Sequence, residues 1–524
     1  MHADKDMVAG TLTADVCIIG GGPTGLFTGL LLHRLGVSVC IIDGKPGPLE
    51  LGRADALNAR TQQYLEVADL LDELLPIGLK CNTSSTFADG EFKSRQNTWW
   101  VGLEHALHKN FLMIGQPVVE KMLASRLDGL VRFSEQVVSV TENDAAVEVV
   151  TDSGFKVRSK YAVGADGARS LVRREIGASF TGTKPEMLWA VLDTFIDTDF
   201  PICSEIITFQ HKGQSRVSWI PRERGMCRFY ALLEGEVSQA LAEQSIKEHL
   251  APHKVEFTKT EWYSTFDVKE RIASTFISKD GHGRIILAGD AAHVHSVNGG
   301  QGLNTGMSDA FNLAWRLAEA VKSRNLQPGA ANEIVRSYDT ERRSIARDVI
   351  DVAARLVRDT VHTAKQYVGT IEKNAGYITG MGVTYSECGS PLVNASNHGI
   401  WKAGNRCPDM IVQKPDGKES RLYTEAAYGK FLVLHVGTDA TADFGFTDAA
   451  APFVIQPLAG AQADTAVLAK NSRVGGASCV RTYTADWASK EDAFFVVVRP
   501  DMYIGHVGRD VEDAKRYLGD LYTN

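Results

Sequence analysis

Three short segments of the sequence combine glycines with a nearby acidic residue, and each follows a run of apolar residues. These segments are Gly20–Gly25, Gly164–Ser170 and Gly289–Gly302. Glycines let a backbone approach a ligand closely, and a carboxylate at a strand end accepts hydrogen bonds from ligand hydroxyls. One such segment is usually only a turn. Three of them, each closing a buried strand, are hard to explain by turn chemistry alone.

The first segment has the spacing of a dinucleotide-binding turn, with glycines at positions 20, 22 and 25. Gly20 permits a tight turn, Gly22 lets the backbone approach a pyrophosphate, and Gly25 allows a helix to pack closely on the strand. The N-terminus of the helix that follows supplies free N–H groups and the positive end of a helix dipole, both of which favour phosphates.

The elements around this turn have the order strand, helix, strand. Apolar residues predict a strand over 14–19, a helix over 26–35 and a second strand over 37–42, the unit that opens a doubly wound α/β fold. Asp43 ends the second strand, 18 residues after Gly25, where an acid can take ribose hydroxyls. This pattern predicts dinucleotide binding, but it does not distinguish NAD(P) from FAD.

The composition is that of an ordinary globular protein, with 524 residues, 44% hydrophobic and 23% charged. The net charge is −8, and the 56 basic residues are spread along the chain, which indicates neither nucleic acid nor membrane as a partner. No stretch approaches the roughly 20 apolar residues needed to span a bilayer. The eight cysteines form no CxxC pair and the N-terminus is polar, so we expect a reduced, cytoplasmic setting.

The sequence resembles the class A flavoprotein aromatic hydroxylases, the family of para-hydroxybenzoate hydroxylase. Three stretches carry the resemblance: GRADALNARTQQYLE at 52–66, GADGARSLVR at 164–173 and GDAAHVHSVNGGQGLNTGMSDAFNLAWRLA at 289–318. Within the family it is most similar to phenol hydroxylase-like enzymes with a C-terminal thioredoxin-like domain. The resemblance covers about residues 13–372 strongly. It covers the C-terminal part weakly, through 404–409 and 498–501.

The resemblance implies an α/β fold class, with an FAD-binding Rossmann-like parallel sheet, an inserted antiparallel substrate sheet and a C-terminal thioredoxin-like α/β domain. The expected ranges are 13–180 and 281–372 for the FAD-binding domain, 181–280 for the substrate sheet, 373–398 for a linker and 399–524 for the thioredoxin-like domain. Cys388, Cys407 and Cys479 are too scattered for a CxxC motif. We therefore expect this last domain to lack thiol exchange, and to cover the substrate domain or form a dimer interface.

The resemblance also implies FAD as the cofactor and indicates residues that bind it. Asp290 would accept hydrogen bonds from the ribityl chain, Arg53 would meet the pyrophosphate and Gln116 would contact the flavin side chain. Asp166 would serve both FAD and the pyridine nucleotide. A helix beginning near Gly302 would stabilise negative charge on the reduced flavin. The expected cofactor-binding residues are Gly20, Gly22, Pro23, Thr24, Gly25, Asp43, Arg53, Gln116, Asp166, Asp290, Gly300, Gly302, Leu303 and Asn304.

Three residues are expected to act on the substrate. Asp55 matches an acid that the phenol hydroxylase-like branch uses near the substrate phenol, where a base or relay helps to form the more nucleophilic phenolate. The alternative for Asp55 is a solvated acid in a loop beside the flavin. Tyr230 and Arg228 match the strand of the substrate sheet, although a sheet tyrosine is more often a packing residue.

Several further residues leave alternatives open. Arg222, Trp219 and Tyr263 are candidate pocket walls. His293 and His295 lack the acid or cysteine partners of a metal site, so we expect no metal. Val297 stands where family members usually carry proline. It restores an N–H and frees φ, so the loop shape, and with it the substrate position and the kind of oxygen insertion, is open.

We therefore expect an FAD-dependent monooxygenase that uses NAD(P)H and O2 to hydroxylate a phenolic substrate through a flavin C4a-hydroperoxide. The alternative is the same flavin chemistry giving epoxidation, oxidative dearomatisation or Baeyer–Villiger insertion on a polycyclic secondary metabolite. A flavin halogenase fits less well, because residues 217–221 contain only one of the two tryptophans of its signature. A distant alternative is a non-catalytic FAD-fold binding protein. The expected partners are a small aromatic substrate and a second copy of the chain in a homodimer.

Overall fold

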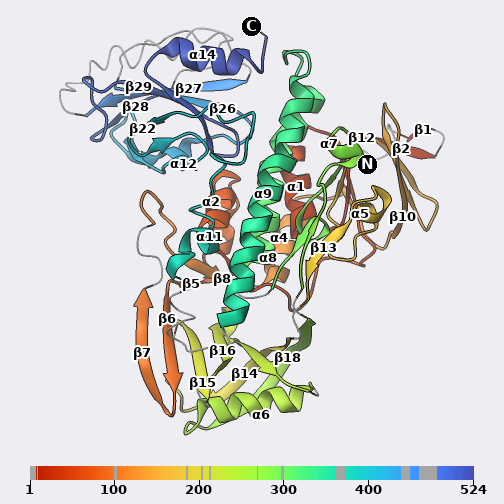
Figure 1. Ribbon diagram of the computed structural model, residues 1–524, viewed down its shortest axis with the longest axis vertical. Coiled ribbons are helices and arrows are strands. Elements are labelled where there is room, and N and C mark those ends of the chain that lie inside the picture. The colour runs from red at the N-terminus through yellow and green to blue at the C-terminus, as the bar shows by residue number, and fades with distance from the viewer. Residues whose placement is uncertain are drawn as a thin grey trace.

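The computed structural model describes residues 7–8, 10–98, 103–184, 187–201, 204–211, 214–235, 237–267, 269–296, 300–359, 370, 372–437, 449–458 and 481–523. The molecule has three parts (Figure 1). A central domain contains the three glycine turns, a largely antiparallel inserted sheet lies at one end, and a C-terminal domain lies at the opposite end. This arrangement confirms the expected fold class.

The central domain is built on an eight-stranded sheet. Its order is β10-β11-β12-β2-β3-β9, with β1 beside β2 and β20 beside β12. The strands are β1 (Met7–Val8), β2 (Thr11–Ile19), β3 (Val39–Ile42), β9 (Val131–Arg132), β10 (Val137–Glu142), β11 (Val147–Thr151), β12 (Lys156–Gly164) and β20 (Ile285–Leu287). β2 pairs in parallel with β3 and β12, and β12 pairs in parallel with β20. Burial on both faces explains the apolar runs of β3, β20 and the end of β2, whereas β10 and β11 alternate buried and exposed residues.

Helices pack around this sheet. They are α1 (Pro23–Arg34), α2 (Ala59–Val67), α3 (Leu71–Leu74), α4 (Gln116–Ser125), α5 (Leu171–Glu175), α7 (Ser278–Gly281), α8 (Gln301–Lys322), α9 (Ala330–Asp359) and α11 (Ala375–Thr379). The long helices α8 and α9 run side by side through the middle of the molecule (Figure 1). The predicted strand–helix–strand unit at 14–42 is confirmed by β2, α1 and β3. Two short sheets complete this domain: β4 (Ala56–Leu57), β8 (Phe111–Met113) and β5 (Leu79–Cys81), and β13 (Phe180–Thr183), β19 (Glu270–Ala273) and β21 (His293–Val294).

The inserted sheet has the strand order β18-β14-β17-β16-β15-β6-β7. Its strands are β6 (Thr83–Ala88), β7 (Glu91–Thr98), β14 (Leu188–Thr198), β15 (Ile206–His211), β16 (Gln214–Pro221), β17 (Cys227–Leu233) and β18 (Val255–Asp267). The sheet therefore extends beyond the expected range 181–280, because β6 and β7 come from the first part of the chain. Helix α6 (Gln239–Leu250) covers one face, where its apolar side chains join a core with Phe87, Phe209 and Phe229.

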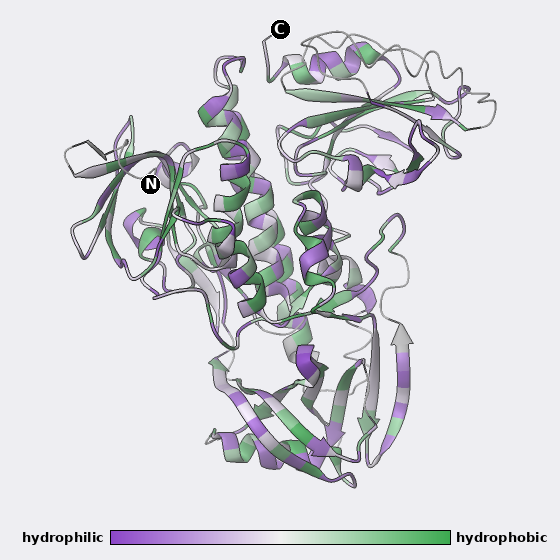
Figure 2. Ribbon diagram, turned by 180° about the vertical axis from the view of Figure 1, so that it is seen from behind, coloured by the Kyte–Doolittle hydropathy of each residue, from purple (hydrophilic) through white to green (hydrophobic). Residues whose placement is uncertain are grey.

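The C-terminal domain contains a mixed sheet in the order β25-β24-β28-β27-β26-β29-β30. Its elements are β22 (Asn397–His398), β23 (Trp401–Lys402), β24 (Ile411–Gln413), β25 (Glu419–Arg421), β26 (Phe431–Val436), β27 (Ala450–Pro457), β28 (Arg481–Ala485), β29 (Phe494–Val498), β30 (Ile504–Gly508), α12 (Leu422–Glu425) and α14 (Val511–Gly519). Helix α14 alternates hydrophobic and hydrophilic residues, and its apolar side packs on the sheet (Figure 2). The central strands β26, β27 and β28 are parallel, and antiparallel strands flank them on both sides. This arrangement is consistent with the expected thioredoxin-like domain.

Four buried charged side chains connect the C-terminal domain to α8 and α9. Arg499 donates hydrogen bonds to both carboxylate oxygens of Glu341, at 2.7 and 2.8 Å, and to Asp501 at 2.6 Å. Arg316 donates to the same two acids, at 2.7 and 3.2 Å. Two guanidiniums thus balance two carboxylates in an interior where an unpaired charge would be costly. The domain docks on α8 and α9, far from the inserted sheet (Figure 1). Of the two expected roles, covering that sheet is therefore wrong, and the dimer interface stays a prediction.

Candidate active site

The three glycine turns meet at one edge of the eight-stranded sheet. They follow β2, β12 and β20, which are neighbours and run parallel, so their carboxyl ends share that edge. The Ala165 N–H donates a hydrogen bond to Ile19 O at 2.7 Å, and the Ala288 N–H donates to Gly164 O at 2.9 Å. In open α/β sheets, ligands bind outside the carboxyl ends of the strands. The turns therefore form one site.

Two glycines of the first turn are required by packing, and the third faces open space. A Cβ on Gly20 would lie 2.2 Å from Ala165 O, and a Cβ on Gly25 would lie 1.9 Å from Gly20 O. A Cβ on Gly22 would meet no atom within 4 Å, although this residue is the N-cap of α1. The turn is thus closed on the protein side and open at the helix N-terminus, where a pyrophosphate fits.

Thr24 joins the first turn to the third. A Cβ on Gly289 would lie 2.7 Å from the Thr24 hydroxyl, and a Cβ on Gly306 would lie 2.3 Å from it. Pro23 occupies the first turn of α1, where its missing N–H costs no hydrogen bond. Helices α1 and α8 and the third turn therefore pack tightly around Thr24.

Asp43 lies directly beside the glycine turn. Its carboxylate accepts hydrogen bonds from the backbone N–H of Gly21 and, at 2.7 Å, from that of Lys45. A carboxylate offers about four acceptor positions, so positions remain for the hydroxyls of a ribose. The structure thus brings this acid to the place that the sequence pattern predicts.

Asp290 has the setting of a ligand-binding acid. Its side chain is accessible to solvent, but the surrounding protein desolvates the carboxylate and raises its pKa. No hydrogen bond joins this carboxylate to another residue in the part of the chain that the structure describes. An accessible, partly desolvated and unpaired acid fits a chain of ligand hydroxyls such as the ribityl chain of FAD.

Helix α8 directs its N-terminus at the same site. Its N-cap Gly300 has φ +63°, and a Cβ there would meet nothing within 4 Å. The first N–H groups of the helix, which include those of Gly302 and Leu303, have no partner within it and form a positive end. The Asn304 side chain accepts from the Asn58 N–H at 2.8 Å and donates to Ala56 O at 3.0 Å. The Asn304 side chain therefore holds β4 against α8. Because that side chain is already paired, only the Asn304 backbone is left to contact a ligand.

His295 stands beside the N-terminus of α8. Its Cε1 lies 4.0 Å from the position of a Cβ on Gly302. Burial lowers the pKa of His295 to about 4, and the neighbouring His293 adds to the shift. The imidazole is therefore neutral at physiological pH. The positive potential at this place comes from the N-terminus of α8 and not from His295.

The low pKa of His295 predicts an acid-sensitive fold. Between pH 6.5 and about 4, the unfolded chain binds a proton at this residue that the folded chain does not. Stability must therefore fall as the pH falls through this range. Urea unfolding at pH 7 and pH 5 should show a smaller difference in His295→Asn than in the wild type. The same exchange at the exposed His33 is the control, and an equal difference in all three proteins would refute the prediction.

His293 is a structural residue in a buried network. Its Nε2 lies 2.8 Å from an Asp309 oxygen, which also accepts from the Gly289 N–H at 2.8 Å. Arg342 donates to the other Asp309 oxygen at 2.7 Å. The network fixes the third turn to α8 and α9. Among the described residues, no group of three or more His, Cys, Asp or Glu is arranged to hold a metal ion.

The Asp166 carboxylate is hydrogen-bonded to residues at the end of the second turn and directly after it. Its carboxylate accepts hydrogen bonds from the Ser170 hydroxyl at 2.6 Å and from the N–H groups of Leu171 and Val172, at 2.7 and 3.1 Å. Burial nevertheless raises its pKa. These contacts cap α5, so the structure supplies a protein partner for each oxygen. A role toward FAD and the pyridine nucleotide stays a prediction.

Gln116, at the start of α4, contacts the loop that contains Arg53. Arg53 has φ +67°, its side chain is exposed, and its charge acts on Asp290. Gln116 accepts a hydrogen bond from the Ala54 N–H at 3.2 Å and donates to Glu120 at 2.7 Å. Gln116 thus positions the loop between Arg53 and Asp55, whatever it contacts in a bound cofactor.

The structure brings together the three residues expected to act on the substrate. The Tyr230 hydroxyl donates a hydrogen bond to an Asp55 oxygen at 3.1 Å, and Arg228 Nη1 lies 3.6 Å from the same oxygen. Asp55 and Arg228 are buried, while Tyr230 is half-buried. Burial, and then the negative charge of Asp55, raise the pKa of Tyr230. Asp55 is therefore not a solvated loop acid.

Asp193 is a member of this cluster that the sequence reasoning missed. Both of its oxygens accept hydrogen bonds from Arg228, each at 2.6 Å, and one also accepts from Arg222 at 3.2 Å. Asp193 lies opposite Arg228 in the pairing of β14 with β17. The only signal for it in the sequence is an acid that follows the apolar run 188–192.

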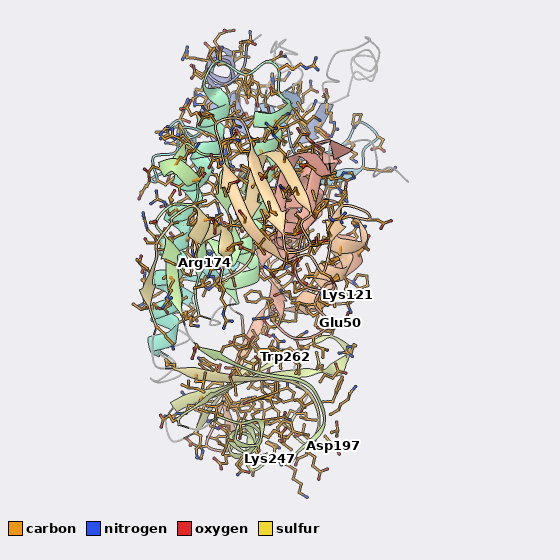
Figure 3. All side chains as sticks on the ribbon, turned by 90° about the vertical axis from the view of Figure 1, so that its right-hand side faces the viewer. Glu50, Lys121, Arg174, Asp197, Lys247 and Trp262 are labelled. Carbon is orange, nitrogen blue, oxygen red and sulfur yellow. The ribbon has the colours of Figure 1, made fainter. Side chains whose placement is uncertain are left out.

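The register of the inserted sheet decides which residues face the central domain. Asp193 pairs with both Arg228 and Trp262, so these three side chains share a face. Trp262 lies between the sheet and the central domain, whereas Lys247 and Asp197 lie farther from it (Figure 3). Trp219 and Tyr263 belong to the opposite face, where Trp219 lies in the core under α6 and Tyr263 packs half-buried against that core. Our expectation that these two residues form pocket walls is therefore wrong.

One departure from the family's usual sequence lies in a segment that the structure does not describe. Val297, which stands where the family usually carries proline, lies outside the described residues. Its effect on the substrate position stays a prediction.

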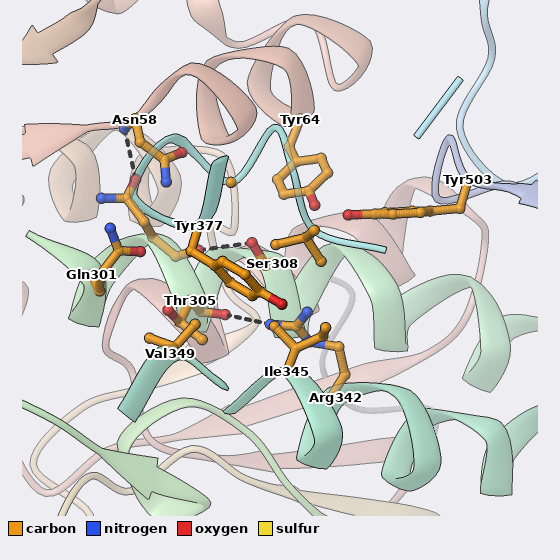
Figure 4. Close-up of a pocket in the computed structure, with 13 residues that line it drawn as sticks. Asn58, Tyr64, Gln301, Thr305, Ser308, Arg342, Ile345, Val349, Tyr377 and Tyr503 are labelled. Carbon is orange, nitrogen blue, oxygen red and sulfur yellow. Dashed lines mark hydrogen bonds between the residues drawn. The ribbon is translucent and has the colours of Figure 1, made fainter. Parts of the chain in front are cut away.

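A narrow cavity, lined by polar and apolar side chains, lies between α8 and α9 at the junction with the C-terminal domain (Figure 4). It is wide enough only for water-sized molecules. Its walls include Tyr64 from α2, Arg342 from α9 and Tyr503 from the C-terminal domain. None of Asp55, Arg228 and Tyr230 lines it, so it is distinct from the candidate substrate site.

The sequence matches a protein family described as FAD binding domain over residues 13–353, and the chain belongs to this family. The match contains all three glycine turns and the candidate substrate residues. It agrees with the geometry, in which Gly22, Asp290 and the N-terminus of α8 form one open site. FAD is thus the cofactor of the fold.

Curated relatives are oxygenases by name. FAD-dependent monooxygenase ankC of Aspergillus thermomutatus is 29% identical over 64% of this chain and 61% of its own length. Phenol 2-monooxygenase fsqG of Aspergillus fumigatus is 29% identical over 80% of this chain and 75% of its own. 3-Hydroxybenzoate 4-monooxygenase of Comamonas testosteroni is 27% identical, with 84% and 78% covered. The chain thus spans less than two thirds of the length of the first of these relatives.

Solved structures share the fold along nearly the whole chain. OxyS anhydrotetracycline hydroxylase from Streptomyces rimosus has a TM-score of 0.73 and 23% identity, covering 98% of this chain and 100% of its own. Aklavinone-11 hydroxylase, solved with FAD and aklavinone, has a TM-score of 0.73 and 21% identity, with 96% and 98% covered. The likeness includes the C-terminal domain. In the described part of the chain, no helix is both long and apolar enough to cross a membrane.

Proposed function

We propose that the protein is an FAD-dependent monooxygenase that uses NAD(P)H and O2 to hydroxylate a phenolic substrate. When bound, FAD accepts electrons from NAD(P)H and passes one oxygen atom of O2 to the substrate, while the other leaves as water. Membership of the FAD-binding family and the names of the relatives support this reading. The observation that carries it is the hydrogen-bonded pair of Tyr230 and Asp55 between the inserted sheet and the FAD-binding region.

The expected cofactor residues act in three groups. The turn of Gly20, Gly22, Pro23, Thr24 and Gly25 would receive the pyrophosphate, with Arg53 as its cation. Asp43 would take the ribose hydroxyls, and Asp290 would take the ribityl chain. The N-terminus of α8, from Gly300 to Asn304, would face the pyrimidine side of the flavin, where its N–H groups favour negative charge.

Tyr230 and Asp55 form a proton relay for the substrate. Because Tyr230 stays protonated well above neutral pH, it acts by passing protons and not as a base itself. The substrate hydroxyl donates its proton to the Tyr230 oxygen as Tyr230 donates its own proton to Asp55. The substrate becomes a phenolate, Tyr230 is unchanged and Asp55 becomes neutral. A phenolate carries more electron density on the ring carbon that receives oxygen.

The relay predicts a large effect of a single hydroxyl. Tyr230→Phe should lower the rate of product formation by about 10²–10⁴-fold, the usual contribution of general acid–base catalysis. FAD content and substrate affinity should change little. Tyr263→Phe, on the opposite face of the sheet, is the matched control and should keep the wild-type rate. The measurement is product formed per NAD(P)H oxidised, with peroxide quantified. Wild-type turnover by Tyr230→Phe would rule out the relay.

A second candidate is oxidation of a polycyclic substrate by the same chemistry. The structural likeness to anhydrotetracycline hydroxylase and aklavinone-11 hydroxylase favours it, because both match this chain almost from end to end. Product mass and structure from a panel of simple and polycyclic phenols would distinguish hydroxylation from epoxidation, dearomatisation or Baeyer–Villiger insertion. Absence of NAD(P)H oxidation with every phenol would favour the non-catalytic FAD-binding alternative.

The cellular compartment and the oligomeric state belong to the same proposal. The cysteines at 17, 40, 81, 227, 388 and 407 are free thiols, which supports a reducing, cytoplasmic compartment. We propose a homodimer as the working state, and sedimentation of the full chain tests it.

A further inference from the structure

We infer that the substrate site excludes phenols that carry a carboxylate, and that Asp193 sets this selectivity by occupying Arg228. The inference rests on the proposed function and adds a substrate class to it. It comes from the charges beside Tyr230: three carboxylates, those of Asp55, Asp193 and Glu223, face only two guanidiniums, those of Arg222 and Arg228.

Arg228 has no free edge for a substrate anion. Its Nε and Nη2 form a two-point contact with Asp193, at 2.6 Å each. Its Nη1 donates to the backbone carbonyl of Arg53 and lies 3.6 Å from Asp55. The guanidinium is 0% exposed, and the Trp262 ring lies 5.2 Å from it. A two-point contact is the geometry by which arginine binds carboxylates, and here the protein's own acid uses it.

Arg222 is occupied in the same way. Its Nε and Nη2 donate to the two oxygens of Glu223, at 2.9 and 2.8 Å, and its Nη1 donates to Asp193 at 3.2 Å. It is 3% exposed. Asp193 therefore bridges both arginines, and the cluster keeps one negative charge in excess.

A further carboxylate would meet this excess charge in a poorly solvated place. Like charges brought together at such sites oppose binding. Two other cations act near the cluster. The charge of Arg53 acts on Asp290, on the FAD side, and the exposed Arg224 is paired with Glu261 at 2.6 Å, so neither balances the excess. A neutral phenol meets none of this repulsion. The chain thus differs from what the name of 3-hydroxybenzoate 4-monooxygenase says of that relative.

Asp193 is a positioning residue in this account, because it acts through Arg228. Asp193→Asn keeps the shape of the side chain, removes one negative charge and weakens the hold on Arg228. Loss of a merely structural contact would weaken all ligands alike. Loss of the charge should instead change the ratio between neutral and anionic ligands.

The experiment titrates FAD-loaded protein with two matched pairs of probes, followed by the change in flavin absorbance. The pairs are phenol with 3-hydroxybenzoate, and 2-naphthol with 3-hydroxy-2-naphthoate. The pair used is the one whose neutral phenol binds more tightly. The wild type should bind that phenol at least about 100-fold more tightly than the matching acid, the equivalent of about 2.8 kcal/mol. Asp193→Asn should reduce this ratio at least tenfold. Asp197→Asn, an exposed acid on the same strand, should leave it unchanged.

Two further results keep the test decisive if Asp193→Asn fails to fold. Glu223→Gln removes a carboxylate from the other end of the cluster and should shift the ratio in the same direction by a smaller amount. The wild-type ratio alone also decides: equal binding of acid and phenol overturns the inference. An unchanged ratio in a folded Asp193→Asn protein that still hydroxylates phenols overturns it too, while leaving the proposed function intact. If no probe perturbs the flavin or stimulates NAD(P)H oxidation, both fail.

Discussion

The Gly22→Asp variant should fold normally and purify without FAD. Gly22 is the N-cap of α1, has φ −83°, and has no atom within 4 Å of the position of a Cβ. Any residue therefore fits there without strain, and aspartate is a favourable N-cap. The new carboxylate would occupy the helix N-terminus that a pyrophosphate needs. Since like charges in contact cost several kcal/mol, FAD affinity should fall at least about 100-fold.

The control for this variant is Gly22→Ala, which adds a methyl group to the same open space without charge and should purify yellow. Thermal unfolding of the two proteins freed of FAD should show that Gly22→Asp is at least as stable as Gly22→Ala. Flavin content is measured by absorbance after denaturation. A yellow Gly22→Asp protein with one FAD per chain would show that the pyrophosphate does not lie at this turn.

The Arg499→Met variant should lower the free energy of unfolding by about 3–5 kcal/mol, the usual cost of removing one partner from a buried ion pair. Arg499 is 0% exposed and donates to both Glu341 and Asp501. Without it, two buried carboxylates share the single guanidinium of Arg316. Because Glu341 belongs to α9 and Asp501 to the C-terminal domain, the loss should loosen the contact between domains.

Arg509→Met is the matched control, because Arg509 is 73% exposed and pairs with Asp492 at 3.1 Å on the surface. Such a pair contributes up to about 1 kcal/mol, so this variant should unfold close to the wild type. Urea unfolding of the FAD-loaded proteins, followed by circular dichroism, compares them. If Arg499→Met were as stable as Arg509→Met, the buried charges would not hold the domains together.

Local patterns along the chain predicted the FAD-binding part of the molecule well. The turn at 20–25 combines glycine spacing, a buried strand and a helix within about 30 residues, and β2, α1 and β3 confirm it. The acids Asp43 and Asp290 are placed by strand ends, which sequence patterns mark clearly. The Cβ distances at Gly20 and Gly25 give the physical reason for those glycines.

Contacts between distant segments could not be predicted in this way. β6 and β7 join the inserted sheet through β15, about 120 residues later in the chain, and no local pattern specifies that pairing. Trp219 and Tyr263 looked suited to a pocket by residue type. Which face of a strand is buried depends on α6, however, and the alternation of residues does not show it.

The ion pairs of buried charged residues also could not be predicted from the sequence. Arg316 and Glu341 occur in helices where a charged residue normally indicates a solvent-exposed face, and their partners follow in the chain by up to 185 residues. Asp193 gave no more signal than any other polar residue in a strand. Its importance appears only once the register of β14 and β17 sets it opposite Arg228.

The most direct test of the proposed function is oxygen transfer from isotopically labelled O2. FAD-loaded protein, NAD(P)H and a panel of simple and polycyclic phenols are incubated under the labelled gas, and the products are analysed by mass spectrometry. The account predicts a product that carries one labelled oxygen atom for each NAD(P)H oxidised in coupled turnover. Unlabelled products, or NAD(P)H oxidation that yields only peroxide with every phenol in the panel, would contradict it.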